Sequence, residues 1–163
     1  MPTLSALALC VHLINVSAAS PALVADAQRQ LTAMFAAIGV DVRWSDAPES
    51  LLLVLRDDEP GGLRRGAKPI MGVALHAGQG TPAAYVFVRR AAEEADRYRA
   101  PRASIVACAM AHEIAHLLLP VSGHARSGLM RGCWDHEEFA QAARGELRLL
   151  PDEAASIRAR VGR

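Results

Sequence analysis

Apolar residues along the chain follow two patterns. The first pattern, short runs of consecutive or nearly consecutive apolar residues, is typical of strands. Short stretches rich in Leu, Val, Ile and aromatic residues are bounded by Ser, Gly, Pro or Asp, which interrupt regular structure. The strands predicted in this way are residues 6–16, 40–44, 51–56, 70–78 and 83–90.

The second pattern places apolar residues three and four positions apart and predicts helices. The first helix begins at Pro21 with Ser20 as its N-cap and ends before Gly39. Later helices are predicted over 102–119, where Pro120 stops the helix, over 136–145, capped by Asp135, and over 151–160; the pattern also allows a helical stretch over 91–99. Loops are predicted over 57–69 and 123–134. This order of elements predicts an α+β fold in which a small mixed sheet is backed by helices.

The composition is that of one compact domain. The chain has 163 residues, of which 52% are hydrophobic. We expect a single domain over 1–163, with a sheet-and-helix part over 1–119 and a loop with C-terminal helices over 120–163. The formal net charge of +1 gives no electrostatic footprint for nucleic acid or an anionic membrane, so neither is predicted as a partner.

The N-terminal residues and the cysteines argue against two further kinds of protein, a membrane-spanning protein and a disulfide-rich one. No signal peptide or membrane-spanning segment is recognised in the chain, although export of a longer precursor stays open, so no compartment is predicted. Cys10, Cys108 and Cys133 are odd in number and have no CxxC spacing, which is not a disulfide framework or a cysteine zinc site. We interpret Cys108 as a core residue.

One motif in the chain carries chemistry. Residues 112–116 read HEIAH, and Glu113 is the only acidic residue between Arg102 and Arg126. On a helix, His112 and His116 share one face about one turn apart, so both imidazoles can bind one zinc ion. Glu113 is rotated by about 100° and can act as a general base on a zinc-activated water without being a ligand. The alternative is a metal-free core helix, but a buried carboxylate without a cationic partner is costly.

A catalytic zinc site needs a third protein ligand, and it must come from beyond Pro120. His124 is the first candidate, because Gly123 allows the chain to turn back toward the metal. The following segment supplies the other candidates, first Glu137 or Glu138 and then Asp135 or His136.

The segment HEIAHLLLPVSGH, followed by SGLM, resembles the zincin metallopeptidases of the metzincin type. In that family HExxHxxGxxH supplies three histidines, and a later methionine forms a turn beneath the metal. The resemblance implies one zinc per chain held by His112, His116 and His124, with Glu113 as the catalytic base and Met130 in the Met-turn. Two positions depart from the family: Leu119 stands at the family glycine, and the family histidine would fall at Ser122.

The wider chain is similar to small uncharacterised bacterial proteins of zincin type. The similar segments are residues 14–44, AAYVFV at 83–88, AHEIAHLLL at 111–119 and the tail 135–161. This resemblance implies a zincin-like fold with a short C-terminal helical subdomain and an edge strand above the metal. We assign that strand to 83–88 and expect a peptide substrate to bind along it in extended form.

The function implied is a zinc metallopeptidase that hydrolyses peptide bonds. A second donor to the developing oxyanion is usually needed, and Tyr85, Tyr98, His76 and Arg126 are the candidates. The alternative function is a non-catalytic zinc-binding module of zincin fold that binds a protein partner.

Overall fold

The computed structural model describes residues 7–59, 70–76, 81–120 and 123–163. The strands are β1 (Leu7–Asn15), β2 (Val40–Trp44), β3 (Leu51–Arg56), β4 (Gly72–Leu75) and β5 (Ala83–Phe87). The helices are α1 (Pro21–Ala36), α2 (Val88–Arg97), α3 (Arg102–Leu118), α4 (His136–Ala143) and α5 (Pro151–Val161).

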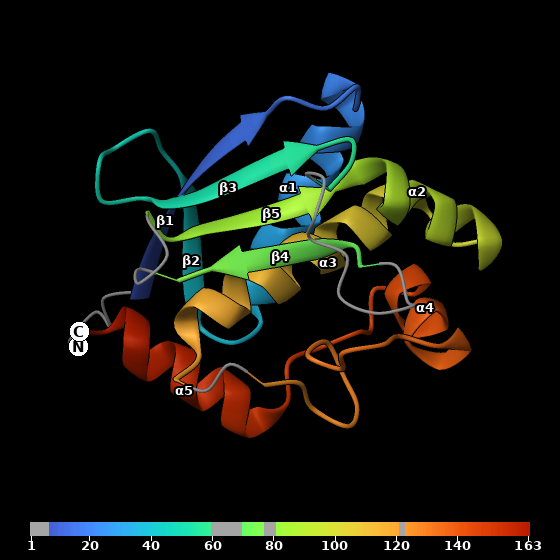
Figure 1. Ribbon diagram of the computed structural model, residues 1–163. Coiled ribbons are helices and arrows are strands. Elements are labelled where there is room, and N and C mark those ends of the chain that lie inside the picture. The colour runs from blue at the N-terminus through green and yellow to red at the C-terminus, as the bar shows by residue number, and fades with distance from the viewer. Residues whose placement is uncertain (1–6, 60–69, 77–80, 121–122) are drawn as a thin grey trace.

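The strands form one five-stranded mixed sheet in the order β2-β1-β3-β5-β4 (Figure 1). Strands β2, β1, β3 and β5 are parallel to one another. Strand β4 runs antiparallel to β5, with Val73 opposite Tyr85. Helix α1 connects the parallel neighbours β1 and β2, as parallel pairing requires. The predicted α+β class, with a mixed sheet backed by helices, is confirmed.

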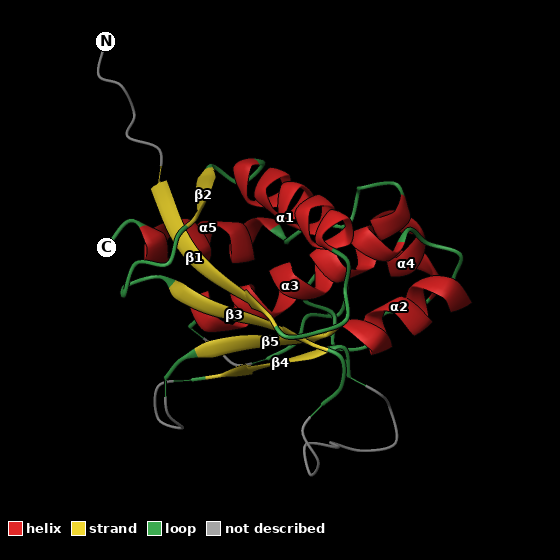
Figure 2. Cartoon of the chain, turned by 90° about the horizontal axis from the view of Figure 1, so that it is seen from above, coloured by secondary structure: helices red, strands yellow, loops and turns green. Residues whose placement is uncertain are grey.

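Helix α3 lies at the centre of the molecule. Together with α1 it covers one face of the sheet (Figure 2), and it also contacts α2, α4 and α5. Its side chains are buried almost all round the helix, from Ser104 to Ala115, which explains its uniformly apolar sequence. No helix in the described part of the chain is long and apolar enough to cross a membrane.

Local sequence signals account for several of the observed helix ends. The Ser20 hydroxyl accepts a hydrogen bond from the Leu23 N–H (3.2 Å), and Gly39 has the positive φ (+79°) expected after a helix. Asp135 caps α4 as predicted, within a capping box that includes Glu138. The last residue of α3 is Leu118, because Pro120 disfavours helical geometry at Leu119, whose ψ is 142°.

The strand predicted over 83–90 is too long by three residues. It ends at Phe87, and α2 begins directly at Val88. The side chain of Arg90 pairs with Glu93 (2.9 Å) and Glu94 (3.2 Å), and such pairs three and four residues apart stabilise a helix. The strand predicted over 70–78 is observed as Gly72–Leu75; its last two residues, and most of the loop predicted over 57–69, lie outside the described residues.

The assignment of the edge strand to 83–88 is wrong. Strand β5 lies between β3 and β4, and β4 is the outer strand on this side of the described sheet. The error arose because β4 and β5 form an antiparallel pair, and the second strand of that pair, not the first, joins β3 in parallel. The edge nearest α3 is therefore Gly72–Leu75.

Candidate metal centre

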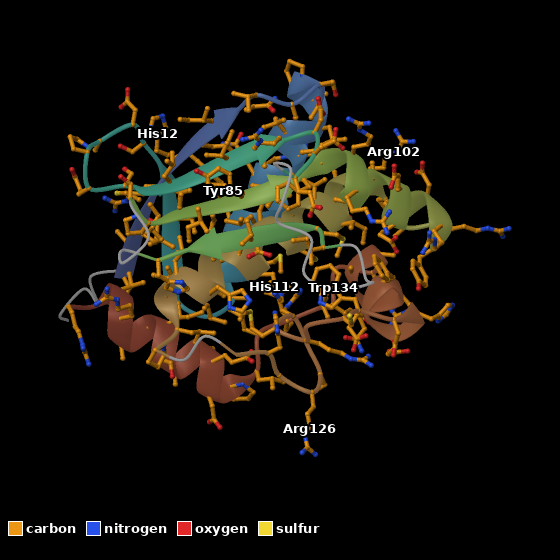
Figure 3. All side chains as sticks on the ribbon, viewed as in Figure 1. His12, Tyr85, Arg102, His112, Arg126 and Trp134 are labelled. Carbon is orange, nitrogen blue, oxygen red and sulfur yellow. The ribbon has the colours of Figure 1, made fainter. Side chains whose placement is uncertain are left out.

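Three histidine side chains converge between the end of α3 and the segment that follows it. Figure 3 labels the first of them, His112. His112 and His116 lie one turn apart on α3, with their Nε2 atoms 3.1 Å apart. His124 reaches the same point from beyond Pro120, and its Nε2 atom is 3.2 Å from that of His116. All three ligand atoms lie within 4.8 Å of one another, so this cluster could hold a metal ion.

A carbonyl group fixes the orientation of His112. Its Nδ1 donates a hydrogen bond to the Leu129 carbonyl oxygen (2.7 Å), so the lone pair of the neutral ring is on Nε2 and faces the other histidines. The same carbonyl accepts a hydrogen bond from the Trp134 indole N–H (3.2 Å). The Trp134 ring also stands edge-on to the His112 ring, with centroids 6.0 Å apart. Such supporting contacts set the ring orientation and basicity of a metal ligand.

The protonation state of the cluster suits a metal. Burial lowers the pKa of His112 to about 4, and burial together with the neighbouring His124 lowers the pKa of His116 to about 4. Both rings are therefore neutral at pH 7, which is the form that binds metals. The His116 Nε2 can donate a proton to only one of its two close neighbours, so hydrogen bonding alone leaves one contact unsatisfied.

Two of the three spacings between the nitrogen atoms, those from His116, are compatible with zinc. Two ligands of a tetrahedral zinc ion, each about 2.0–2.1 Å from the metal, stand roughly 3.3 Å apart. The observed 3.1 Å and 3.2 Å are close to that spacing. Exposure rises through the set, from buried His112 through half-buried His116 to exposed His124. The cluster is therefore open to solvent on the His124 side, unlike a structural zinc site enclosed by four ligands.

Glu113 directly follows His112 on α3, and its side chain lies against the edge strand. It is 7% exposed, and it has no hydrogen bond or ion pair within the described residues. Burial raises its pKa to about 8. A Cβ atom at Gly72 of β4 would lie 2.6 Å from the Glu113 Cγ and 2.7 Å from its Oε1. The backbone of β4 therefore packs directly on this carboxyl group, and only glycine leaves room for it.

Met130 lies in a tight turn after the third histidine. The Ala125 N–H donates to the Met130 carbonyl (2.9 Å), the Arg131 N–H donates to the Gly128 carbonyl (3.1 Å), and Gly128 has a positive φ of +76°. Met130 itself is 1% exposed. The turn carries the Leu129 carbonyl that orients His112, so it supports the histidine cluster.

Gly132 provides the space for the third histidine. A Cβ atom there would lie 2.7 Å from the His124 Cγ and 2.9 Å from its Nδ1, far inside normal contact. The imidazole of His124 is therefore packed against the bare backbone of Gly132.

The other candidates for the third ligand are engaged in building α4. Asp135 caps the helix and pairs with Arg131 (2.7 Å). Glu138 is buried and pairs with the same arginine (2.5 Å), while Glu137 accepts a hydrogen bond from Gln141. His136 belongs to no metal-type cluster of the described residues. Cys108, at 5% exposed, also lies outside the histidine cluster, as expected of a core residue.

Three of the four candidates for a second oxyanion donor point elsewhere. Tyr85 alternates along β5 with Ala84, which packs against the helices, so Tyr85 lies on the opposite face of the sheet. Tyr98 stacks on Phe139 with ring centroids 4.1 Å apart. Arg126 is exposed and points outward from its loop, away from the cluster (Figure 3).

The fourth candidate, His76, lies close to the cluster, but its Nε2 already takes part in a hydrogen bond. It directly follows β4, and its Nε2 donates to the main-chain carbonyl of His116 (3.0 Å). His76 thus contacts the backbone of a candidate ligand.

Three residues that shape the site were not identified from the sequence: Gly72, Gly132 and Trp134. The two glycines act through the space that a missing side chain leaves, and Trp134 contacts His112, which is distant in sequence. Neither effect has a local sequence signal. No protein-family model matches the chain, and a search of curated proteins gives no significant match.

Proposed function

We propose that this protein is a zinc-dependent hydrolase of zincin-like fold, most specifically a peptidase. The observation that carries the proposal is the convergence of three histidine nitrogens, next in sequence to the buried Glu113, whose carboxyl group has no hydrogen bond or ion pair within the described residues. A purely structural site has no need of that acid, whereas a hydrolytic site needs a group that accepts and returns a proton.

His112, His116 and His124 would hold the metal. A zinc ion supplies Lewis acidity, because it lowers the pKa of a bound water to about 7 and polarises a carbonyl oxygen. Glu113 takes the proton from the attacking water and delivers it to the leaving amine. Its site between α3 and β4 shields the carboxyl group from bulk water.

The edge strand β4 is the part of the sheet best suited to receive a substrate. As the outer strand it has main-chain groups on one side that are not used within the described sheet. An extended peptide can pair with such an edge by main-chain hydrogen bonds. Because β4 packs on Glu113 through Gly72, a peptide bound there would lie next to the catalytic acid.

Two further features support the zincin-like assignment. An antiparallel edge strand adjoins the helix that carries HEIAH, and a tight turn containing Met130 follows the third histidine. The departures from the metzincin pattern at Leu119 and His124 are accommodated, since the His124 ring still reaches the two helical histidines.

The test combines metal content with hydrolysis. Protein purified without added metal should contain about one zinc per chain by elemental mass spectrometry, and His124→Ala should lose most of it. Glu113→Gln should keep its zinc and lose hydrolysis of a mixed peptide library read by mass spectrometry. Glu49→Gln, at an exposed glutamate in the turn before β3, is the matched control and should behave as the wild type.

The two parts of the proposal can fail separately. A chain that binds no zinc, even after addition and dialysis, would refute the metal centre. A chain that binds zinc through the three histidines but cleaves no peptide would refute the peptidase and leave a zinc-binding module that recognises a protein partner.

A further inference from the structure

The C-terminal end of α3 has a carbonyl group that the helix cannot satisfy. In an α-helix the carbonyl of His116 would accept a hydrogen bond from the N–H of residue 120. Residue 120 is proline, which has no N–H, and the last bond of this helix runs from the Leu119 N–H to the Ala115 carbonyl (2.8 Å). The carbonyl of a candidate metal ligand therefore needs a donor from outside the helix.

His76 supplies that donor. Its Nε2 lies 3.0 Å from the His116 carbonyl oxygen, forty residues away in sequence. A carbonyl only accepts, so the proton of this bond is on the His76 ring. His76 is the residue directly after Leu75, the last residue of β4, and Figure 1 shows that end of β4 beside the C-terminal end of α3.

A second contact joins β4 to α3 at the other end of this short strand. Gly72, at the start of β4, packs on Glu113, and His76, just past its end, bonds to His116. Both partners are on α3 and belong to the HEIAH segment. The edge strand is thus held against the catalytic helix at each end, once by close backbone packing and once by a hydrogen bond.

We propose that His76 is a positioning residue that clamps the edge strand β4 to the metal-binding helix through the carbonyl that Pro120 leaves without a partner. The clamp sets the distance between the strand that receives substrate and the metal centre. Its part in substrate binding rests on the proposed function; the clamp itself does not. His76 is accordingly not an oxyanion donor in this arrangement, since its Nε2 proton is already used.

Hydrogen exchange followed by mass spectrometry tests the clamp without any need for activity. In His76→Leu the amides of 72–75 and of 117–119 should exchange about fivefold faster than in the wild type, as expected for loss of one hydrogen bond. His76→Gln should restore most of the protection, because its side-chain amide keeps an N–H donor at similar reach. The control is His12→Leu, since His12 is on β1, next to Leu52 of β3 and away from α3, and this variant should leave both segments unchanged.

Kinetics on a cleaved peptide give the second readout. His76→Leu should raise KM about tenfold with little change in kcat or zinc content, since the substrate lies on β4 whereas the ligand rings are held by α3. Wild-type exchange in His76→Leu would overturn the clamp, and so would faster exchange throughout the chain, which indicates general destabilisation. Failure of His76→Gln to restore protection would also overturn it. Altered exchange in a protein that cleaves no peptide would leave the clamp intact and refute only the peptidase.

Discussion

Gly132 is the position where one added methyl group should disable the proposed metal centre. In Gly132→Ala the new Cβ would lie 2.7 Å from the His124 Cγ, 2.9 Å from its Nδ1 and 3.1 Å from its Cβ. The φ angle of Gly132 is not in the left-handed region, so alanine is compatible with the backbone. The effect should therefore come from the lost space and not from backbone strain.

The magnitude follows from two distances. Ordinary contacts to a Cβ begin near 3.4 Å, so the His124 ring must retreat by about 0.7 Å. Metal–ligand distances tolerate only about ±0.2 Å, so the ring cannot make that movement and remain a good ligand. Disturbing a residue that supports a ligand typically costs 10–100-fold in affinity, and we expect about hundredfold here, or about 2.7 kcal/mol.

The assay is a zinc titration against a chromogenic chelator, combined with thermal unfolding of the metal-free protein. Zinc affinity should fall, while the melting temperature without metal should stay near the wild-type value. The reason for this separation is that His124 is exposed and can swing into solvent when no metal holds it.

A double-mutant cycle gives the sharpest check on the reasoning. In a His124→Ala background the Gly132→Ala change should have no further effect on zinc affinity, because the displaced ring is already absent. Wild-type affinity in the single variant would show that the cluster adapts to the methyl group. A full additional loss in the double variant would show that Gly132 acts on something other than His124.

Three other predictions address the supporting residues. Trp134→Phe, which keeps an aromatic side chain but removes the N–H donor to the Leu129 carbonyl, should weaken zinc binding about tenfold, and unchanged affinity would contradict that role. Burial raises the pKa of Glu113 to about 8 from an ordinary 4.5. Between these pH values the Glu113 carboxyl group is protonated in the folded protein and ionised in the unfolded chain. The metal-free wild type should thus lose unfolding free energy relative to Glu113→Gln as pH rises, by up to about 1.4 kcal/mol per pH unit, whereas parallel pH profiles would refute the burial. With a thiol reagent at pH 8, exposed Cys133 should react first, half-buried Cys10 next and Cys108 only on unfolding, because burial raises its pKa to about 12; immediate reaction of all three thiols would be inconsistent with the fold.

Local patterns were sufficient to predict most of the elements and two members of the site. Strands 40–44 and 51–56 were predicted at their observed bounds, since Gly39 and the polar residues on either side leave little freedom. His112 and His116 follow from helical geometry alone. The position of His124 was less constrained, because its approach to the metal depends on how the chain turns after Pro120.

Strand order could not be read from local patterns, because pairing between β5 and β3 brings together residues about thirty positions apart in sequence. One signal did favour the observed order. Four of the five residues of β5, AAYVF, are buried, so both of its faces are covered, whereas all four residues of β4 are only half-buried. A strand that is apolar on both faces is typical of a central position, and the weaker run at 72–75 is typical of an edge.

The long connection to the third histidine explains why the site depends on residues far from the helix. A glycine at position 119 would allow the chain to turn back toward the histidine cluster at once, but Leu119 is extended and Pro120 follows. The return of the chain is fixed downstream, by the bond between Ala125 and Met130 and by the bare backbone of Gly132. The first two histidines of the cluster are therefore set by α3 and its packing, whereas the third is set by the turn that also orients His112 through Leu129. Because one turn controls two of the three imidazoles, loosening it should cost more zinc affinity than loosening the connection itself.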